Sequence, residues 1–475
     1  MTEHLITAAT CLGCGCTCDD IDLLVRDDRI VEARRACELG IAWFGDGRVP
    51  SGARVDGRDV AAADAIDAAA TLLTRAARPL VYLAPDVSCE TQRETVALAD
   101  TLRAMLDSVT SSTAAGAILA SQARGRAGAT LGEVRNRADV LLFWAVDPAA
   151  RYPRFWSRYA PEPAGLHVPN GRRSRTVVAV DVGDARGPAD ADVRISIAAG
   201  DDVAVLTALT ASVLRYKPDP TTETLGPVRD AAADDIALEP QAGGEVRLKP
   251  DTTGDREVRL KPDTTSDRSV RLQADDGTPR RPDDAARELA DALVRGRYVV
   301  VVADGEPDGP RDPDRAEALL ALGHALNGPT RGAVVTLRGG GNRTGADAVL
   351  TAQTGYPMAV DFARGYPRYA AGEATIVRAA RGDIDAALVV GAAAGIPRAV
   401  QEAIGTLPGI VIGPRATGSP WRDRGVAIDT GVAGIHEPGT ALRLDDVPLP
   451  LRPSVAGPPA TVDVVRQLLA RMRTR

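Results

Sequence analysis

Apolar residues along this chain gather in short continuous runs, and stretches with the spacing of an amphipathic helix separate these runs. Between residues 64 and 78 the apolar positions fall on one helical face, and Pro79 ends that pattern before the apolar run at 80–83. Further Val-rich runs lie at 138–146, 176–182, 298–303, 333–337, 386–390 and 410–412. Helical spacing returns at 203–214, 285–294 and 316–326. Uninterrupted apolar strands that alternate with helices predict an α/β protein with parallel sheets in doubly wound, Rossmann-like modules.

One segment interrupts this alternation of strands and helices. Between residues 245 and 280 a twelve-residue unit occurs three times, as EVRLKPDTTGDR, EVRLKPDTTSDR and SVRLQADDGTPR. The surrounding segment 216–281 is rich in Pro, Asp, Thr and Gly, which bury too little apolar surface to offset the entropy of ordering. We expect a disordered insertion there. The predicted domains are a cysteine domain at 1–55, α/β blocks at 56–215 and 282–430, and a C-terminal segment at 431–475.

Length and charge narrow the functional classes. At about 150 residues per domain, 475 residues correspond to roughly three folding units. The net charge of −7 comes without a basic stripe that could neutralise a phosphate backbone, which argues against nucleic-acid binding. No run approaches the roughly eighteen apolar residues of a membrane span, and no secretory signal opens the chain, so we expect a cytoplasmic protein.

The densest chemical signal lies near the N-terminus, where closely spaced cysteines are followed by one more after eighteen residues. In a cytosolic chain such cysteines indicate metal or redox chemistry rather than disulfides. Thiolates with the spacing C-x2-C-x3-C on a Gly-containing loop can converge on one iron–sulfur cluster when a fourth ligand reaches them. The candidate metal ligands are Cys11, Cys14, Cys18 and Cys37.

A β-hairpin would bring the fourth ligand to the loop. Strand-like segments at 21–26 and 29–33, joined by Asp27 and Asp28, return the chain so that the last cysteine arrives there. An iron–sulfur cluster is the favoured interpretation, and a zinc ion or a relic site that holds no metal are the alternatives. Cys16 would then be a spectator thiol, and Cys89 a small buried residue.

Several runs of the sequence resemble one known family. The opening TCLGCGCTCDDI and the later RACELG are similar to the N-terminal cluster domain of the molybdopterin oxidoreductases. The runs at 130–159, 337–369 and 432–452 narrow the resemblance to the B subunits of formylmethanofuran dehydrogenases. The second run is the most specific, because it keeps GYP and PRY in order. The resemblance covers nearly the whole chain apart from 216–281.

The resemblance implies a fold and a reaction. These B subunits have the multidomain fold of the large pterin-binding oxidoreductases, with a tungsten or molybdenum bis-pterin centre beside a 4Fe–4S cluster. With partner subunits they interconvert carbon dioxide and formylmethanofuran. The residues that match the cluster ligands are Cys11, Cys14, Cys18 and Cys37.

The chain departs from the family pattern near the catalytic centre. Thr113 stands where the resemblance places the metal-binding cysteine, and Ala114 stands where a histidine follows. A hydroxyl is a poor substitute for a soft thiolate on tungsten or molybdenum, and an alanine cannot relay a proton. Asp181, Val182 and Gly183 likewise replace an Asp-Pro-Arg motif on the nucleotide side of the family's site.

A Gly-rich run after a predicted strand is the other candidate part of the site. Its first residue, Arg338, matches an arginine that lines the family's active-site region. A Gly-rich turn after a parallel strand can cradle phosphate on backbone N–H groups, although this one has neither the Walker nor the dinucleotide spacing. The alternatives are a vestigial pterin-facing or carrier-facing loop and an ordinary loop. The candidate cofactor-binding residues are Gly339, Gly341, Asn342 and Gly345.

The departures favour a scaffold that is kept while the oxidoreductase site is dismantled. We expect the B subunit of a formyltransferase/hydrolase complex, which passes a formyl group to a methanofuran-type carrier and releases formate. The resemblance implies amidohydrolase-like, formyltransferase-like and glutamate-synthase-like β-helix partners. The chain's own four histidines form no ligand motif for the hydrolysis. The alternatives are an active tungsten or molybdenum formylmethanofuran dehydrogenase subunit and a generic iron–sulfur electron-transfer protein.

Overall fold

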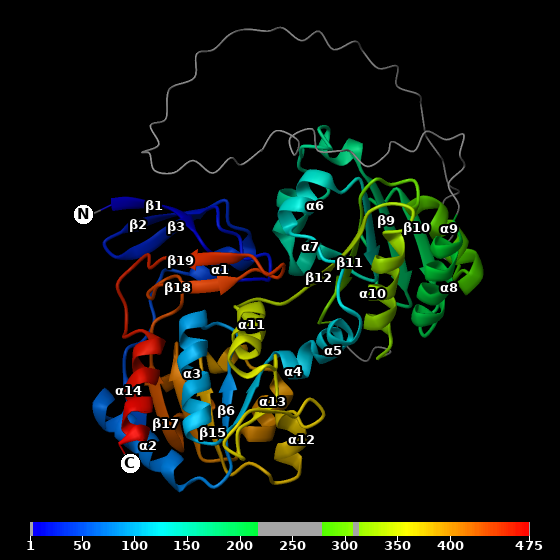
Figure 1. The fold of residues 1–475 in the computed structure, drawn as a ribbon. Coiled ribbons are helices and arrows are strands. Elements are labelled where there is room, and N and C mark those ends of the chain that lie inside the picture. Colours follow the sequence, from blue (N-terminus) through cyan, green and yellow to red (C-terminus); the bar gives the residue numbers. More distant parts are fainter. Residues whose placement is uncertain (1–2, 217–277, 307–312, 475) are drawn as a thin grey trace, which may run out of the picture. The chain divides into compact units, whose positions relative to one another are not determined.

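A computed structural model describes residues 3–216, 278–306 and 313–474 (Figure 1). Contacts group Met1–Arg215 with Asp275–Arg475 in one unit, which contains all the elements described below. Apart from its two ends, the insertion expected at 216–281 lies outside the described residues. Within those residues, no helix combines the length and the apolar composition needed to cross a membrane.

A three-stranded antiparallel sheet opens the chain, followed by a short helix. Its elements are β1 (Glu3–Ala9), β2 (Ile21–Arg26), β3 (Arg29–Arg34) and α1 (Glu38–Phe44). Asp27 and Asp28 have φ angles of +47° and +59°, the conformation that a two-residue hairpin turn of type I′ requires at both central positions. The predicted hairpin is therefore confirmed, with its second strand one residue longer than expected.

A five-stranded parallel sheet has the order β10-β9-β8-β11-β12. Its strands are β8 (Val140–Trp144), β9 (Thr176–Val182), β10 (Val193–Ile197), β11 (Val299–Asp304) and β12 (Gly332–Leu337). Leu142 and Trp144 pack in one core against α8 (Asp202–Arg215), α9 (Pro282–Leu293) and α10 (Arg315–Leu326). Leu141 and Phe143 face the opposite core, which includes α6 (Leu131–Arg137) and the cysteine loop. Burial on both faces explains why these strands read as uninterrupted apolar runs.

The larger sheet has nine strands, and it is mixed rather than parallel throughout. Its order is β14-β13-β7-β6-β15-β16-β17-β4-β5, with the five strands from β7 to β17 parallel and the pairs at both edges antiparallel. The strands are β4 (Ala53–Val55), β5 (Arg58–Asp59), β6 (Pro79–Leu83), β7 (Met105–Ser108), β13 (Val360–Asp361), β14 (Arg368–Tyr369), β15 (Ala386–Val390), β16 (Gly409–Gly413) and β17 (Gly425–Asp429). The predicted parallel pairing is therefore present in the centre of this sheet, and the antiparallel pairs at its two edges were not predicted.

Helices cover both faces of the nine-stranded sheet (Figure 1). On one face lie α2 (Ala62–Arg75), α3 (Cys89–Thr101), α11 (Arg343–Thr354) and α14 (Thr461–Arg473). On the other lie α12 (Thr375–Ala380) and α13 (Arg398–Ile404). The predicted helix at 64–78 corresponds to α2, which ends three residues earlier than expected.

The chain passes between the two large sheets twice. After β7 it runs through α4 (Thr110–Thr113) and α5 (Ala115–Arg124) to the five-stranded sheet, and after β12 it returns through α11. Each sheet therefore takes strands from both sequential blocks, 56–215 and 282–430, and neither block corresponds to one sheet. The remaining elements include α7 (Pro148–Arg151), a π-helix (Phe155–Tyr159), four short 3-10 helices, and the antiparallel pair β18 (Gly439–Leu442) and β19 (Pro448–Leu451).

Candidate functional site

The four cysteines predicted as cluster ligands line one small cavity. Three come from the loop between β1 and β2, and Cys37 stands at the N-terminal end of α1. The full lining is Cys11, Cys14, Cys18, Ile21, Ala36, Cys37, Leu39, Gly40 and Arg154. A backbone hydrogen bond of 2.8 Å from Cys11 N to Cys18 O closes the loop. In the ranges that the structure describes, no three His, Cys, Asp or Glu side chains are placed to hold a single metal ion.

Burial shapes the chemistry of these thiols. It raises the pKa of Cys11 and raises that of Cys18 to about 11, because a thiolate is poorly solvated away from water. A metal that binds here would therefore displace protons. Cys16 is fully buried in the same loop but is not among the residues that line the cavity. Cys89 is buried elsewhere, as expected, and its sulfur accepts a hydrogen bond from Asn342 Nδ2 at 3.4 Å.

The Gly-rich run after β12 lies against protein backbone on two sides. Gly341 N donates to Leu12 O of the cysteine loop at 2.8 Å, and Asn342 N donates to Pro85 O, after β6, at 2.5 Å. Gly341 has a φ of +91°, and a side chain there would place its Cβ 2.2 Å from Pro85 O. The run therefore joins the cysteine loop to the nine-stranded sheet, and these two N–H groups bind carbonyls of the protein.

The other candidate cofactor-binding residues also have protein partners. Asn342 is fully buried, and its Oδ1 accepts a hydrogen bond from Leu442 N at 2.8 Å. A Cβ at Gly345 would lie 2.0 Å from that same oxygen. Gly339 N donates to Glu306 Oε2 at 3.2 Å. Cofactor binding by these residues stays a prediction, and packing alone explains why the positions require glycine and asparagine.

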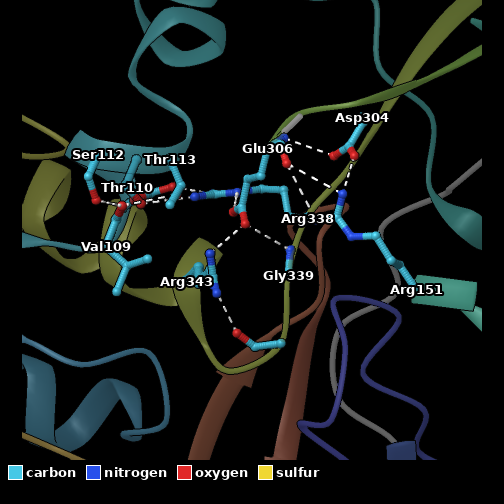
Figure 2. Close-up of polar contacts among 12 residues, drawn as sticks. Val109, Thr110, Ser112, Thr113, Arg151, Asp304, Glu306, Arg338, Gly339 and Arg343 are labelled. Carbon is cyan, nitrogen blue, oxygen red and sulfur yellow. Dashed lines mark hydrogen bonds and ion pairs between the residues drawn. The ribbon is translucent and has the colours of Figure 1, made fainter. Parts of the chain in front are cut away.

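Arg338 lies in a buried network that links the two large sheets (Figure 2). Its Nη2 donates to Thr110 Oγ1 of α4 at 2.9 Å, and that hydroxyl donates to Asp347 Oδ1 of α11 at 2.6 Å. The guanidinium also pairs with Asp347 and with Glu306, whose Oε1 is 3.3 Å from Arg338 Nε. Arg343 pairs with the second oxygen of Glu306.

The formal charges of this network balance. Three guanidiniums face three carboxylates. Arg338 pairs with Glu306 and Asp347, and Arg343 also pairs with Glu306. Arg151 pairs with Asp304. Burial opposes the charge on Arg338, but the adjacent carboxylates outweigh it and keep the pKa of Arg338 above its ordinary value. The group therefore stays cationic, and it is tied into ion pairs on both sides.

Thr113 lies one helical turn beyond Thr110, which binds Arg338. The structure therefore brings the two predicted active-site positions, Thr113 and Arg338, into one neighbourhood (Figure 2). The Thr113 hydroxyl donates to Val109 O of its own helix at 3.0 Å. Ala114 is buried behind it. A neutral hydroxyl that already donates to a carbonyl offers a hard oxygen where tungsten or molybdenum would require a soft thiolate. This position does not fit a metal ligand.

The second departure from the family pattern comes at Val182 and Gly183, directly after Asp181, which has a structural role. Asp181 is buried one residue before the end of β9, and both of its carboxylate oxygens lie 2.8 Å from Arg194 Nη1 of the neighbouring strand. One of them also accepts a hydrogen bond from Gly187 N at 2.7 Å. The carboxylate thus holds the loop after β9 rather than projecting into an open site.

A larger cavity was not anticipated from the sequence. Its volume is about 990 Å³, and it opens at the carboxyl ends of β6, β15 and β16, where Asp86, residues 392–394, 414–415 and 417–420 line it. The sheet order reverses between β6 and β15, and ligands of open α/β sheets bind at such switch points. Three arginines, Arg48, Arg54 and Arg415, and two acids, Asp46 and Asp86, are among the lining residues, an excess of basic side chains that suits an anionic ligand.

Sequence reasoning missed several of these residues for identifiable reasons. Glu306 and Asp347 each lie within a few residues of a loop. Their local sequence pattern does not distinguish them from acidic residues on the surface. Arg154 lies far from the cysteines along the chain, so only the fold brings it to their cavity. The one signal in the sequence for the large cavity was Gly391, directly after an apolar strand, and simple packing also explains a glycine there. In the structure its φ angle is +108°.

Comparison with known proteins adds relatives that span the chain. No protein-family model matches it. It is 29% identical over 478 residues to the B subunit of tungsten-containing formylmethanofuran dehydrogenase 2 from Methanocaldococcus jannaschii, covering 98% of this chain and 97% of the relative. The B subunit of the enzyme of the same name from Methanococcus maripaludis is 28% identical over 461 residues, covering 94% and 93%.

A solved structure shares the fold. The chain matches one from the crystal structure of the formyltransferase/hydrolase complex FhcABCD of Methylorubrum extorquens in complex with methylofuran. The TM-score is 0.64 at 22% identity, over 89% of this chain and 99% of that one. Together with the sequence relatives, whose similarity runs from end to end, this match bears out the family resemblance of the sequence. The chain is a homologue of the B subunits of formylmethanofuran dehydrogenases.

Proposed function

We propose that this chain is the B subunit of a formyltransferase/hydrolase-type complex and carries out no tungsten or molybdenum chemistry of its own. It would keep the molybdopterin-oxidoreductase fold as a scaffold for formyl transfer and formate release by its neighbours. The structural likeness to a chain of FhcABCD and the end-to-end similarity to dehydrogenase B subunits support this proposal.

The observation that carries the proposal is the state of Thr113. Its hydroxyl donates within α4, and the arginine opposite, Arg338, is held by Glu306 and Asp347. A metal at this position would have to replace an internal hydrogen bond and would gain only a hard, neutral oxygen. The residue at this position therefore supports the proposal that the site has lost its metal ligand.

A 4Fe–4S cluster, in contrast, fits the cysteines of this chain. Four thiols at C-x2-C-x3-C spacing, with a fourth from α1, surround a cavity instead of converging on one point. A cluster needs this arrangement, because each thiolate binds a different iron. We propose that Cys11, Cys14, Cys18 and Cys37 hold such a cluster, which would crosslink the loop to α1.

The proposed partners follow from the same relatives. The FhcABCD structure is a complex in which methylofuran is bound. We propose that this chain assembles with amidohydrolase-like, formyltransferase-like and β-helix glutamate-synthase-like subunits, and that a methanofuran-type carrier serves the complex. Affinity purification of the tagged full chain from its native cells should recover the amidohydrolase-like and formyltransferase-like subunits in fixed proportion.

Metal analysis of the purified complex tests the central proposal. Tungsten and molybdenum should each be below a tenth of an equivalent per chain when cells are grown with both metals. The tungsten-containing relative of Methanocaldococcus jannaschii, purified in the same way, serves as the positive control. Either metal near one equivalent in the complex would overturn the proposal.

An active tungsten or molybdenum formylmethanofuran dehydrogenase subunit is the second candidate. The large cavity at the carboxyl ends of β6, β15 and β16 favours it, since a chain without a pterin has no evident need for a pocket of that size with arginines in its lining. This candidate predicts viologen-linked oxidation of formylmethanofuran or formate that Arg338→Gln abolishes. The exposed Arg398→Gln is the matched control, and an absence of viologen reduction by the intact complex would eliminate the candidate.

A further inference from the structure

An arginine from the five-stranded half of the molecule forms part of the wall around the four cysteines. Arg154 lines their cavity and directly precedes the π-helix Phe155–Tyr159. Its Nη1 and Nη2 donate to Asp20 Oδ1 and Oδ2 at 2.5 and 2.7 Å. Asp20 follows Cys18 by two residues. The bidentate pair therefore fixes the guanidinium beside a predicted cluster ligand.

A second pair on the same π-helix strengthens this placement. Arg158 Nη2 donates to Asp19 Oδ1 at 2.5 Å, and Arg158 Nη1 lies 3.3 Å from Asp20 Oδ1. The side chains of Arg154 and Arg158 are only 14% and 17% exposed. Their partners Asp20 and Asp19 are 31% and 35% exposed, so these partly buried pairs are screened less by solvent than fully exposed pairs.

We propose that Arg154 and Asp20 form a charged pair that sets the reduction potential of the cluster held by Cys11, Cys14, Cys18 and Cys37. This inference rests on the cluster proposed above, and it assigns a tuning role to residues outside the ligand set. Arg154 is the guanidinium that lines the cavity, whereas Asp20 positions it and partly offsets its charge.

The direction of the effect follows from charge. A cluster with four thiolate ligands carries a net negative charge, and reduction adds one electron to it. A cation at the cavity wall stabilises the reduced form more than the oxidised form, and net charge and hydrogen bonds near the sulfurs are known determinants of cluster potential. Loss of Arg154 should lower the potential, and loss of the Asp20 carboxylate should raise it.

The test is an EPR-monitored redox titration of the purified full chain after anaerobic reconstitution with iron and sulfide. Arg154→Gln should shift the reduction equilibrium at least tenfold toward the oxidised form, which is 59 mV or more for a one-electron couple. Asp20→Asn should shift it in the opposite direction. Arg154→Lys keeps the charge and should stay closer to the wild-type potential than Arg154→Gln.

Arg26→Gln is the matched control, because Arg26 lies in the same N-terminal sheet, is about half exposed and pairs with Glu3. Its potential should equal that of the wild type. A cluster that forms but titrates identically in the wild type, Arg154→Gln and Asp20→Asn overturns the inference and leaves the cluster proposal standing. Failure of the wild type to take up iron and sulfide overturns both. If Arg154→Gln does not retain the cluster, the reduction potentials of Asp20→Asn and Arg154→Lys still test the inference. An Asp20→Asn potential equal to that of the wild type counts against it.

Discussion

Glu437 is a buried acid in the segment after β17, and its side chain contacts the start of α14. Its Oε2 accepts a hydrogen bond from Thr461 N, and among the described residues its Oε1 has no hydrogen-bond partner. Burial raises the pKa of Glu437 to about 7, and the nearby Asp86 carboxylate adds to the effect. The folded protein therefore holds a proton on this side chain at pH values where the unfolded chain has released it.

This shift predicts a pH-dependent stability that one substitution removes. Between the unfolded value near 4.5 and the folded value near 7, the contribution of Glu437 to the free energy of unfolding should fall as pH rises, by about 3 kcal/mol in all. Glu437→Gln keeps an oxygen for Thr461 N and cannot ionise. It should match the wild type near pH 4 and exceed it by up to that amount at pH 8, as measured by urea denaturation.

Glu402→Gln is the control for that prediction, because Glu402 is exposed on α13 and pairs with Arg398 one turn away. Its unfolding free energy should follow that of the wild type within about 0.5 kcal/mol at both pH values, as is usual for surface positions. Equal stability of Glu437→Gln and the wild type at pH 8 would contradict the assignment of a raised pKa.

Single residues also show where sequence reasoning stopped. The family resemblance located Thr113 and Arg338, and the fold brings their elements together through Thr110. It did not reveal that Glu306 and Asp347 hold the arginine, because ion-pair partners are separated along the chain and leave no local pattern. Positions could be inferred from motifs, whereas their chemical state required the three-dimensional contacts.

At the scale of elements, the Gly-rich run after β12 is a backbone junction whose glycines are required sterically. Gly341→Ala would force a side chain into the left-handed region and place its Cβ 2.2 Å from Pro85 O, which belongs to backbone and cannot swing away. We expect a loss of at least about 3 kcal/mol in unfolding free energy, since overpacking adds to the left-handed penalty of about 1 kcal/mol. Chemical denaturation of the full chain measures it.

Gly355 supplies a matched control for this junction. It ends α11 at φ +86°, and a Cβ there meets nothing within 4 Å. Gly355→Ala should therefore lose only the backbone penalty of about 1 kcal/mol. If the two variants lose the same stability, close contact with Pro85 is not what requires glycine at position 341.

Elements with strong apolar periodicity were predictable, and those without it were not. Every Val-rich run named from the sequence forms a strand, including β9 and β15 with the expected bounds. β7 and β17 were missed because each ends in a polar residue, so neither reads as an uninterrupted apolar run. Their place in the nine-stranded sheet depends on neighbours far along the chain, which local pattern cannot reveal.

At the scale of the whole molecule, the cysteine region is not an independent appendage. Cys11, Cys14 and Cys18 belong to the same apolar core as Leu141 and Phe143 of β8. The cysteine loop also receives a hydrogen bond from the Gly-rich run at Leu12 O. The sequence predicts a separate N-terminal domain, and we expect shared packing of this kind to couple its folding to that of the five-stranded sheet.

This coupling predicts that cluster binding stabilises more than the cysteine loop. A group that binds only the folded state stabilises it by mass action, and the shared core passes that gain to the transition that unfolds the five-stranded sheet. Calorimetry of the full chain, with and without reconstituted iron and sulfide, should show that transition at least several degrees higher with the cluster, since about 1 kcal/mol shifts a domain of this size by about 2–4 °C.

Two neighbouring cysteines allow this prediction to be checked against a close control. Cys14→Ser removes a cavity-lining thiol and should abolish the shift, whereas Cys16→Ser changes an equally buried thiol that does not line the cavity and should retain it. Each variant is compared with its own unreconstituted form, so that any intrinsic effect of the substitution cancels. An equal loss of the shift in both variants would mean that the loop binds metal through a different set of thiols. A shift confined to a separate, small transition would mean that the cysteine region unfolds by itself and that the shared core does not couple it to the sheet.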